Sequence, residues 1–181
     1  MANVILIGYM GCGKTTIGRK LSYRFRKPFL DTDKQIELKQ KCSISEIFAQ
    51  QGEQDFRDLE TKYLEGLLKE KCEYIISVGG GLPLREENQK LLRKLGTCVY
   101  LEASADTIYE RVKHDTSRPL LQCDDPKKKI QEMLEIRTPI YKSCADLVIS
   151  VDGKRIEEIV VEVKAEVEKR NENISNKRTK S

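Results

Sequence analysis

A glycine-rich stretch near the start of the chain carries the strongest chemical signal in the sequence. Gly8, Gly13, Lys14 and Thr15 fit the pattern G-x-x-x-x-G-K-[ST]. Such glycines allow successive backbone N–H groups to turn inward around an anion, and the following helix N-terminus adds partial positive charge. We expect Lys14 to reach the β- and γ-phosphates of a nucleotide and the Thr15 hydroxyl to ligate Mg²⁺. The stretch indicates nucleotide binding and leaves the phosphate acceptor open.

Two carboxylates follow the next expected strand, residues 27–31. Because ligands bind at the carboxyl ends of the strands in a parallel sheet, we expect Asp31 and Asp33 to face the phosphate loop. Phosphoryl transfer needs an acid that holds Mg²⁺, directly or through water, and a group that orients the attacking hydroxyl. We assign Asp31 to the metal, through water, with Glu102 in reserve, and Asp33 to the acceptor. The alternative for Asp33 is a helix cap, a position that favours aspartate.

Two arginines fall on or beside apolar helix faces. Arg137 shares a face with Ile130 and Leu134 at helical spacing, and Arg57 lies beside a stripe that contains Glu60. A buried guanidinium without an anion is costly, and contacts between arginine and carboxylate can be bidentate. Glu60 can pair with Arg57, which leaves a surplus of cation, so we infer an anionic acceptor and favour a carboxylate. A structural ion pair or a snorkelling side chain is the alternative.

A polar loop and a run of glycines complete the candidate site. The loop at about 113–125 contains Arg118, which in a mobile lid would exclude water and bring positive charge to the γ-phosphate. An ordinary exposed arginine is the alternative. Gly79, Gly80 and Gly81 follow the strand expected at 74–78. They would let a ligand approach the backbone and offer N–H donors, or they would form only a sharp turn.

Strands that alternate with helices must position these residues. We expect strands at 3–7, 27–31, 74–78, 97–101 and 147–149, and helices at 14–25, 34–41, 45–51, 53–71, 86–95, 105–113, 126–143 and 156–168. Such alternation predicts βαβ units and a parallel sheet covered on both faces. The expected fold class is therefore α/β, with three layers in the order αβα.

Composition and charge define the class of protein. The 181 residues suit a single domain, and the 39% apolar and 34% charged residues are typical of a soluble globular protein. No apolar run is long enough to span a membrane and no signal peptide is evident, so we expect a cytoplasmic protein without a membrane partner. The net charge of +4 lies in residues 169–181, which we expect to be a basic, disordered tail after a domain at 1–168. Nucleic-acid binding is not expected.

Cysteine and histidine usage argues against a zinc site. The six cysteines are scattered without a C-x-x-C pair, and His114 is the only histidine. We interpret these cysteines as thiols in a reducing compartment. Cys12 is the exception, because it lies inside the phosphate loop, where its modification would block nucleotide binding.

Together these motifs resemble the shikimate kinase family, over residues 4–149. The matching signatures are Gly8–Thr16 with Ile17 and Gly18, Leu30–Asp33, Ser45–Phe48 with Gly52 and Glu53, Phe56 and Arg57 with Glu60, Gly79–Gly81, Arg118–Leu121, and Arg137 with Tyr141. The resemblance implies a P-loop kinase fold similar to nucleoside monophosphate kinases, with a five-stranded parallel sheet, a mobile lid and a substrate-binding region at about 33–61.

The resemblance also implies an activity, namely ATP-dependent phosphorylation of the 3-hydroxyl of shikimate, with Mg²⁺, on the route to chorismate and the aromatic amino acids. It implies that the ATP phosphates are held by Gly11, Cys12, Gly13, Lys14, Thr15 and Thr16, and that Arg118 reaches ATP from the lid. Implied contacts to shikimate come from Asp33, Arg57, Gly79, Gly80, Gly81 and Arg137. Contacts to adenine are expected from Arg111 and from Lys154 or Arg155.

Two other functions remain open from the sequence. One is a related small-molecule kinase that acts on gluconate or a nucleotide. The other is a non-catalytic nucleotide-binding module whose basic tail docks a partner, although such a module has no need for a lid arginine and an acceptor carboxylate. We expect the protein to act as a monomer with ATP and shikimate as its partners.

Overall fold

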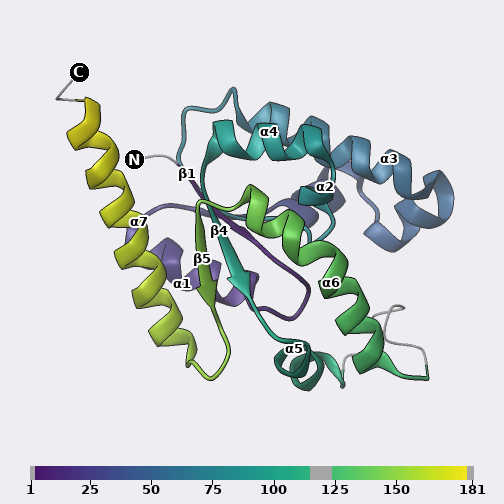
Figure 1. Ribbon diagram of the computed structural model, residues 1–181. Helices are drawn as coiled ribbons and strands as arrows, with labels where there is room; N and C mark the ends of the chain where they lie inside the picture. The colour runs from purple at the N-terminus through teal and green to yellow at the C-terminus, as the bar shows by residue number, and fades with distance from the viewer. Residues whose placement is uncertain (1–2, 115–123, 179–181) are drawn as a thin grey trace.

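Five parallel strands form the centre of the structure, a computed structural model that describes residues 3–114 and 124–178 (Figure 1). The strands are β1 (Asn3–Ile7), β2 (Phe29–Asp31), β3 (Ile75–Ser77), β4 (Gly96–Glu102) and β5 (Leu147–Ser150), in the spatial order β2-β3-β1-β4-β5. In the register of the sheet, Leu6 of β1 lies opposite Ser77 of β3 on one side and Val99 of β4 on the other. The carboxyl ends of these strands therefore meet at one edge.

Helices cover both faces of the sheet. They are α1 (Lys14–Phe25), α2 (Thr32–Gln40), α3 (Ile44–Leu67), α4 (Glu86–Leu95), α5 (Ala105–Val112), α6 (Pro126–Cys144) and α7 (Ile156–Arg178), with a 3-10 turn η1 at Leu82–Leu84. Helices α1 and α7 pack together on one face, α4 and α6 cover the other, and α3 packs against α2 and α4 (Figure 1). This arrangement confirms the predicted three-layer fold. No helix in the described ranges is long and apolar enough to cross a membrane.

The central strands are apolar because helices remove both of their faces from water. Ile5 and Leu6 of β1 and Val99 and Leu101 of β4 have no exposed surface. Burial of this kind contributes roughly 1.5–3 kcal/mol for each large aliphatic side chain. The strands are consequently a rigid support for the polar turns that follow them.

Helix α3 bends at Gly52, whose φ of 89° lies outside the helical region. The sequence predicts two helices here, separated at this glycine, and the bend confirms the interruption. At the start of α3, the Ser43 hydroxyl accepts the Glu46 N–H and the Glu46 carboxylate accepts the Ser43 N–H, which forms a capping box. The second half of the helix carries Arg57 and Glu60 toward the edge where the strands end.

Helix α7 extends further than the sequence predicts. A helix that ends near residue 168 and a disordered tail at 169–181 are wrong for 169–178, because α7 continues to Arg178. The reason is that Val163 and Val167 pack in the core and Arg170, one turn later, forms an ion pair with Asp146 beside β5. The apolar face thus gives way to a polar contact that also holds the helix against the domain.

Candidate active site

The phosphate loop connects β1 to α1. Gly13 has a φ of 98°, where L side chains are rare, and a Cβ atom on Gly8 would lie 2.8 Å from the Leu101 carbonyl oxygen. The Lys14 ammonium donates to the carbonyl oxygens of Gly8 at 2.8 Å and of Tyr9 at 3.0 Å. The loop therefore has the glycine-dependent conformation that its sequence predicts, with its lysine anchored across it.

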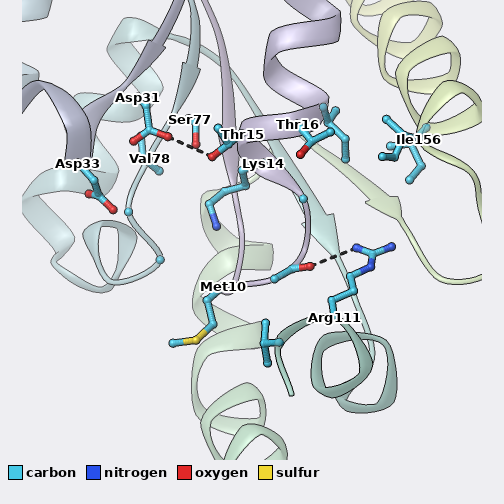
Figure 2. Close-up of a pocket in the computed structure, with 17 residues that line it drawn as sticks. Met10, Lys14, Thr15, Thr16, Asp31, Asp33, Ser77, Val78, Arg111 and Ile156 are labelled. Atoms are coloured by element: carbon cyan, nitrogen blue, oxygen red, sulfur yellow. Dashed lines mark hydrogen bonds between the residues drawn. The ribbon is translucent and has the colours of Figure 1, made fainter. Parts of the chain in front are cut away.

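A cleft of about 500 Å³ opens where β1, β2 and β3 end (Figure 2). The phosphate loop, the strand ends, α5 and the start of α7 surround it. Its walls include many of the residues predicted from sequence, namely Gly11, Gly13, Lys14, Thr15, Thr16, Asp31, Asp33, Gly79, Gly80 and Arg111. Figure 2 shows both aspartates on one side of Lys14 and Arg111 on the other. The fold thus brings the phosphate loop, the two carboxylates and the glycine turn to one cavity.

Thr15 and Asp31 are joined directly. The Thr15 hydroxyl donates to Asp31 Oδ2 at 3.1 Å, and Asp31 Oδ1 accepts the Lys34 N–H at 3.4 Å. Asp31 is therefore the N-cap of α2, the role that was the alternative for Asp33. A hydroxyl and a carboxylate are ligands that suit Mg²⁺, which often keeps several waters and shares phosphate oxygens. Within residues 3–114 and 124–178 no cluster of three or more His, Cys, Asp or Glu could hold a metal.

Asp33 and Glu60 place two buried carboxyl groups against Gly79. A Cβ atom on Gly79 would lie 2.6 Å from Asp33 Oδ1 and 3.0 Å from Glu60 Oε1. Both oxygens are buried without a hydrogen-bond partner in the described part of the chain. Burial, followed by repulsion from Asp31, raises the pKa of Asp33 to about 6. Burial also raises the pKa of Glu60 to about 7, against the attraction of Arg57. Carboxyl groups of this kind can orient a hydroxyl or accept its proton.

Arg57 is held between two glutamates and a glycine. Its Nη1 donates to Glu60 at 2.8 Å and its Nη2 to Glu53 at 2.9 Å. A Cβ atom on Gly81 would lie 2.6 Å from the Arg57 Cζ atom, so only glycine allows the guanidinium to pack against this turn. The ion pair between Arg57 and Glu60 that was the structural alternative is present, and it holds the guanidinium beside the glycine turn.

Arg137 projects from α6 toward the same turn. Its guanidinium carbon lies 5.4 Å from the centre of the Tyr9 ring, and Tyr141, one helical turn later, donates its hydroxyl to the Gly80 carbonyl oxygen at 2.6 Å. The described residues that line the cleft do not include Arg57, Arg137 or Gly81. Arg57 therefore packs against the glycine turn and Arg137 against the phosphate-loop residue Tyr9, and neither arginine lines the cavity itself.

Arg111 lies over the phosphate loop from α5. Its Nη1 donates to the Gly11 carbonyl oxygen at 3.2 Å (Figure 2), and a Cβ atom on Gly11 would lie 2.7 Å from the neighbouring Val112. The close packing of α5 on the loop places the guanidinium at the rim of the cleft, and its contact with adenine stays a prediction.

Lys154 and Arg155 do not line the cleft. Each forms an ion pair with a glutamate of α7, at 2.6 Å for Lys154 and 3.1 Å for Arg155. Ile156 and Ile159, at the start of α7, take this place in the cavity wall. The residues of this region that face the cleft are therefore apolar. Their spacing of three residues is that of an ordinary apolar helix face, so no signal in the sequence marks them as part of the cleft.

Of three further residues singled out from the sequence, the structure describes Cys12 and Glu102. Cys12 is fully buried and lies outside the cleft lining, with its sulfur 3.8 Å from the Lys14 ammonium. Glu102 forms an ion pair with Lys142 at 2.8 Å and does not line the cleft, which leaves Asp31 as the metal candidate. Arg118, and most of the lid predicted at 113–125, lie outside the described residues.

Several residues of the cleft were missed by sequence reasoning. Besides the two isoleucines, they are Met10, Ile17, Ser77, Val78 and Val112. Ser77 is the last residue of β3 and lies opposite Asp31 in the sheet. The rule that ligands bind at the carboxyl ends of strands applies to Ser77 as well as to the glycines that follow it.

The fold and the site define a P-loop kinase. A family model described as shikimate kinase matches residues 10–168. A shikimate kinase of Thermodesulfovibrio yellowstonii is 41% identical over 93% of this chain and 96% of that protein, and one of Pseudomonas syringae pv. tomato is 42% identical over 91% and 95%. The chain belongs to the shikimate kinase family. The predicted class of enzyme, an ATP-dependent kinase, is thereby confirmed.

Solved structures support the same assignment. A shikimate kinase from Acinetobacter baumannii, in complex with shikimate, superposes with a TM-score of 0.87 at 33% identity and covers 94% of both chains. A gluconokinase from Sinorhizobium meliloti has a TM-score of 0.63 at 18% identity, with 97% of both chains covered. The second likeness shows a shared fold alone, which is the reason that phosphate loop and sheet cannot by themselves identify the acceptor.

Proposed function

We propose that the protein transfers the γ-phosphoryl group of ATP to the 3-hydroxyl of shikimate and forms shikimate 3-phosphate, a step toward chorismate and the aromatic amino acids. The observation that carries this proposal is the single cavity that contains Lys14, Asp33, Gly79 and Gly80, with Arg57 packed against the adjoining Gly81 and Arg137 over the ring of Tyr9. Membership of the shikimate kinase family supports the choice of acceptor.

The nucleotide half of the site is the phosphate loop. ATP binds with its phosphates on Gly11–Thr16, and Lys14 exchanges its backbone contacts for phosphate oxygens. Thr15 and Asp31, the latter through water, hold Mg²⁺, which neutralises phosphate charge when bound. Arg111 and the two isoleucines of α7 border the part of the cleft left for adenine, where an apolar surface and a planar cation suit a flat ring.

The acceptor half is the turn of three glycines and its neighbours. Arg57 and Arg137 bind the carboxylate of shikimate, because their planar guanidinium groups match a carboxylate in two hydrogen bonds. Asp33 orients the attacking hydroxyl and accepts its proton, for which its raised pKa is suited. Gly79 and Gly80 leave room for the ring of the acceptor beside the backbone. Arg118 is assigned to the γ-phosphate on the family resemblance.

Positioning and electrostatics supply most of the rate in such a reaction, since the protein forms no covalent bond to the phosphoryl group. Lys14 and Arg118 stabilise negative charge that develops between the two substrates. We propose that the enzyme acts in the cytoplasm. We also propose that it acts as a monomer, because one chain supplies both the nucleotide half and the acceptor half of the site.

A coupled assay of ADP release tests the function. With ATP and Mg²⁺, shikimate is expected to give turnover, whereas gluconate and nucleoside monophosphates give none. Asp33→Ala should lose most of this turnover, and Asp55→Ala, which removes an exposed carboxylate on α3, serves as the matched control. If gluconate is the only acceptor that gives turnover, the protein is a related kinase. If none of the tested acceptors gives turnover, a nucleotide-binding module is favoured.

A further inference from the structure

We infer that Tyr141 is a positioning residue for the acceptor, because its buried hydroxyl ties the side chain of Arg137 to the backbone of Gly80. The inference rests on the proposed function, which makes both Arg137 and Gly80 part of the shikimate site. It concerns a residue that does not line the cleft and whose side chain does not itself contact the acceptor.

The hydroxyl of Tyr141 connects Gly80 with Arg137. It donates a hydrogen bond to the Gly80 carbonyl oxygen at 2.6 Å, and the Arg137 guanidinium lies close enough to lower the pKa of the phenol. A hydroxyl offers one donor and can accept as well, so its oxygen can accept from Arg137 while its proton bonds Gly80. The Tyr141 side chain has no exposed surface, which excludes water as a substitute for either contact.

The contact lies where three parts of the site meet. A Cβ atom on Gly80 would lie 3.4 Å from the Gly8 carbonyl oxygen and 3.7 Å from the Tyr141 hydroxyl. The glycine turn is therefore placed between the phosphate loop and α6. On the loop side, the ring of Tyr9 packs against Arg137. Arg137 is thus in contact with an aromatic ring of the phosphate loop and a hydroxyl of its own helix.

The protonation state of Tyr141 is suited to this role. Burial raises the pKa of the phenol well above its ordinary value, and the nearby Arg137 opposes this only in part. The hydroxyl therefore keeps its proton and remains a donor to Gly80 at any pH at which the enzyme works. Its ring packs against that of Tyr100, with centroids 5.2 Å apart. Aromatic packing therefore holds the ring in place even without the hydroxyl.

Loss of the hydroxyl should weaken acceptor binding selectively. The Gly80 carbonyl would lose its buried partner, and the long Arg137 side chain would be free to occupy other rotamers, which costs entropy when the acceptor binds. In the proposed function the phosphates of ATP bind Gly11–Thr16, whereas the Tyr141 hydroxyl bonds Gly80. The KM for shikimate should therefore rise while the KM for ATP changes little.

The test is the single-atom deletion Tyr141→Phe, measured in steady-state kinetics beside Tyr100→Phe. The control removes a hydroxyl from the neighbouring buried ring, where it lies beside Thr138, whereas the bond to Gly80 comes from Tyr141. For Tyr141→Phe we expect the KM for shikimate to rise about 3- to 30-fold, with the KM for ATP within about twofold. For Tyr100→Phe both KM values should stay within about twofold, and thermal unfolding reports any loss of stability in either variant.

A second comparison separates positioning from a general loss of structure. In an Arg137→Ala background, Tyr141→Phe should raise the KM for shikimate by less than about twofold, because the partner that it positions is absent. The inference is overturned if Tyr141→Phe leaves this KM unchanged, if it raises both KM values together, or if its full effect persists without Arg137. Absence of wild-type turnover with shikimate would overturn the proposed function first. Normal wild-type turnover with an unaffected Tyr141→Phe would overturn this inference alone.

Discussion

The Thr15 hydroxyl donates a hydrogen bond of 3.1 Å to Asp31 Oδ2 and so joins the phosphate loop to the end of β2. The two residues come from different strand ends, yet each is also fixed locally, Thr15 in the first turn of α1 and Asp31 as the N-cap of α2. The two oxygen atoms that the proposed function assigns to Mg²⁺ are therefore held together by the protein itself. Such preorganisation lowers the cost of assembling a metal site.

The first prediction concerns Asp31→Asn. Asparagine caps a helix as well as aspartate does, so α2 should be retained while the negative charge that attracts Mg²⁺ is lost. We expect the Mg²⁺ concentration for half-maximal activity to rise by about tenfold or more, in line with the removal of one charged group from a metal shell. Titration of Mg²⁺ in the ADP-release assay measures this, and Asp55→Asn is the exposed control. An unchanged requirement would remove Asp31 from the metal site.

The second prediction concerns the acid limb of the pH profile. Because the pKa of Asp33 is raised to about 6 and its base form is the one that orients the hydroxyl, kcat/KM for shikimate should fall as the pH drops below about 6. In Asp33→Asn we expect activity to drop by about 100-fold or more and this limb to disappear. A wild-type profile that stays flat from pH 7 down to about 5 would contradict the assigned role.

The third prediction concerns the contact between Gly81 and Arg57. The methyl group of Gly81→Ala would lie 2.6 Å from Arg57 Cζ, so the guanidinium must move away from the turn. We expect the KM for shikimate to rise by about tenfold with little change in the KM for ATP. Gly66→Ala is the matched control, since a Cβ atom there meets nothing within 4 Å and alanine favours the helix. Equal kinetics for the two variants would show that the packing of Arg57 on Gly81 has no part in acceptor binding.

The residues that sequence predicted well are those whose role follows from a local pattern. The phosphate loop needs glycines at fixed spacing, and Asp31 and Asp33 follow an apolar strand whose carboxyl end must face that loop. The parallel sheet and the position of the cleft at its strand ends then follow from the alternation of strands and helices, whereas the order of the strands does not.

The residues that sequence could not place depend on contacts between distant segments. Ile156 and Ile159 have the spacing of an ordinary buried helix face, so nothing in their pattern separates the cleft wall from the core. The ordered end of α7 depends on an ion pair between Arg170 and Asp146, 24 residues apart in sequence, that composition alone hides. Similarly, the capping choice between Asp31 and Asp33 is decided by where α2 begins, and helix boundaries are the least certain feature of a sequence pattern.

The fourth prediction concerns Glu60 and stability. The folded protein holds Glu60 with a pKa of about 7, above the ordinary value of 4.5, because burial disfavours its charge. The folded state therefore binds the proton more tightly than the unfolded state between these values, and the stabilising contribution present at low pH is lost as the pH rises through this range. Relative to wild type, Glu60→Gln should gain stability from pH 5 to pH 8, about 1 kcal/mol or more in thermal or urea unfolding. If the free energy of unfolding of Glu60→Gln relative to wild type is instead lower at pH 8 than at pH 5, the ion pair with Arg57 outweighs the cost of burying the charge.

The last prediction concerns the end of α7. Asp146 accepts the Cys98 N–H at 2.9 Å and also pairs with Arg170, so it links β4 to the segment after residue 168. The Arg170 side chain is 36% exposed, so solvent screens the pair, and Arg170→Ala should reduce the free energy of unfolding by only about 0.5–1 kcal/mol. Lys169→Ala, on an exposed neighbour, should have no measurable effect, and both variants should keep wild-type kinetics because neither residue lines the cleft. If the two variants have the same free energy of unfolding, the contact of Arg170 with Asp146 does not stabilise the domain. The stabilising part of the chain would then end near residue 168, as the sequence predicts.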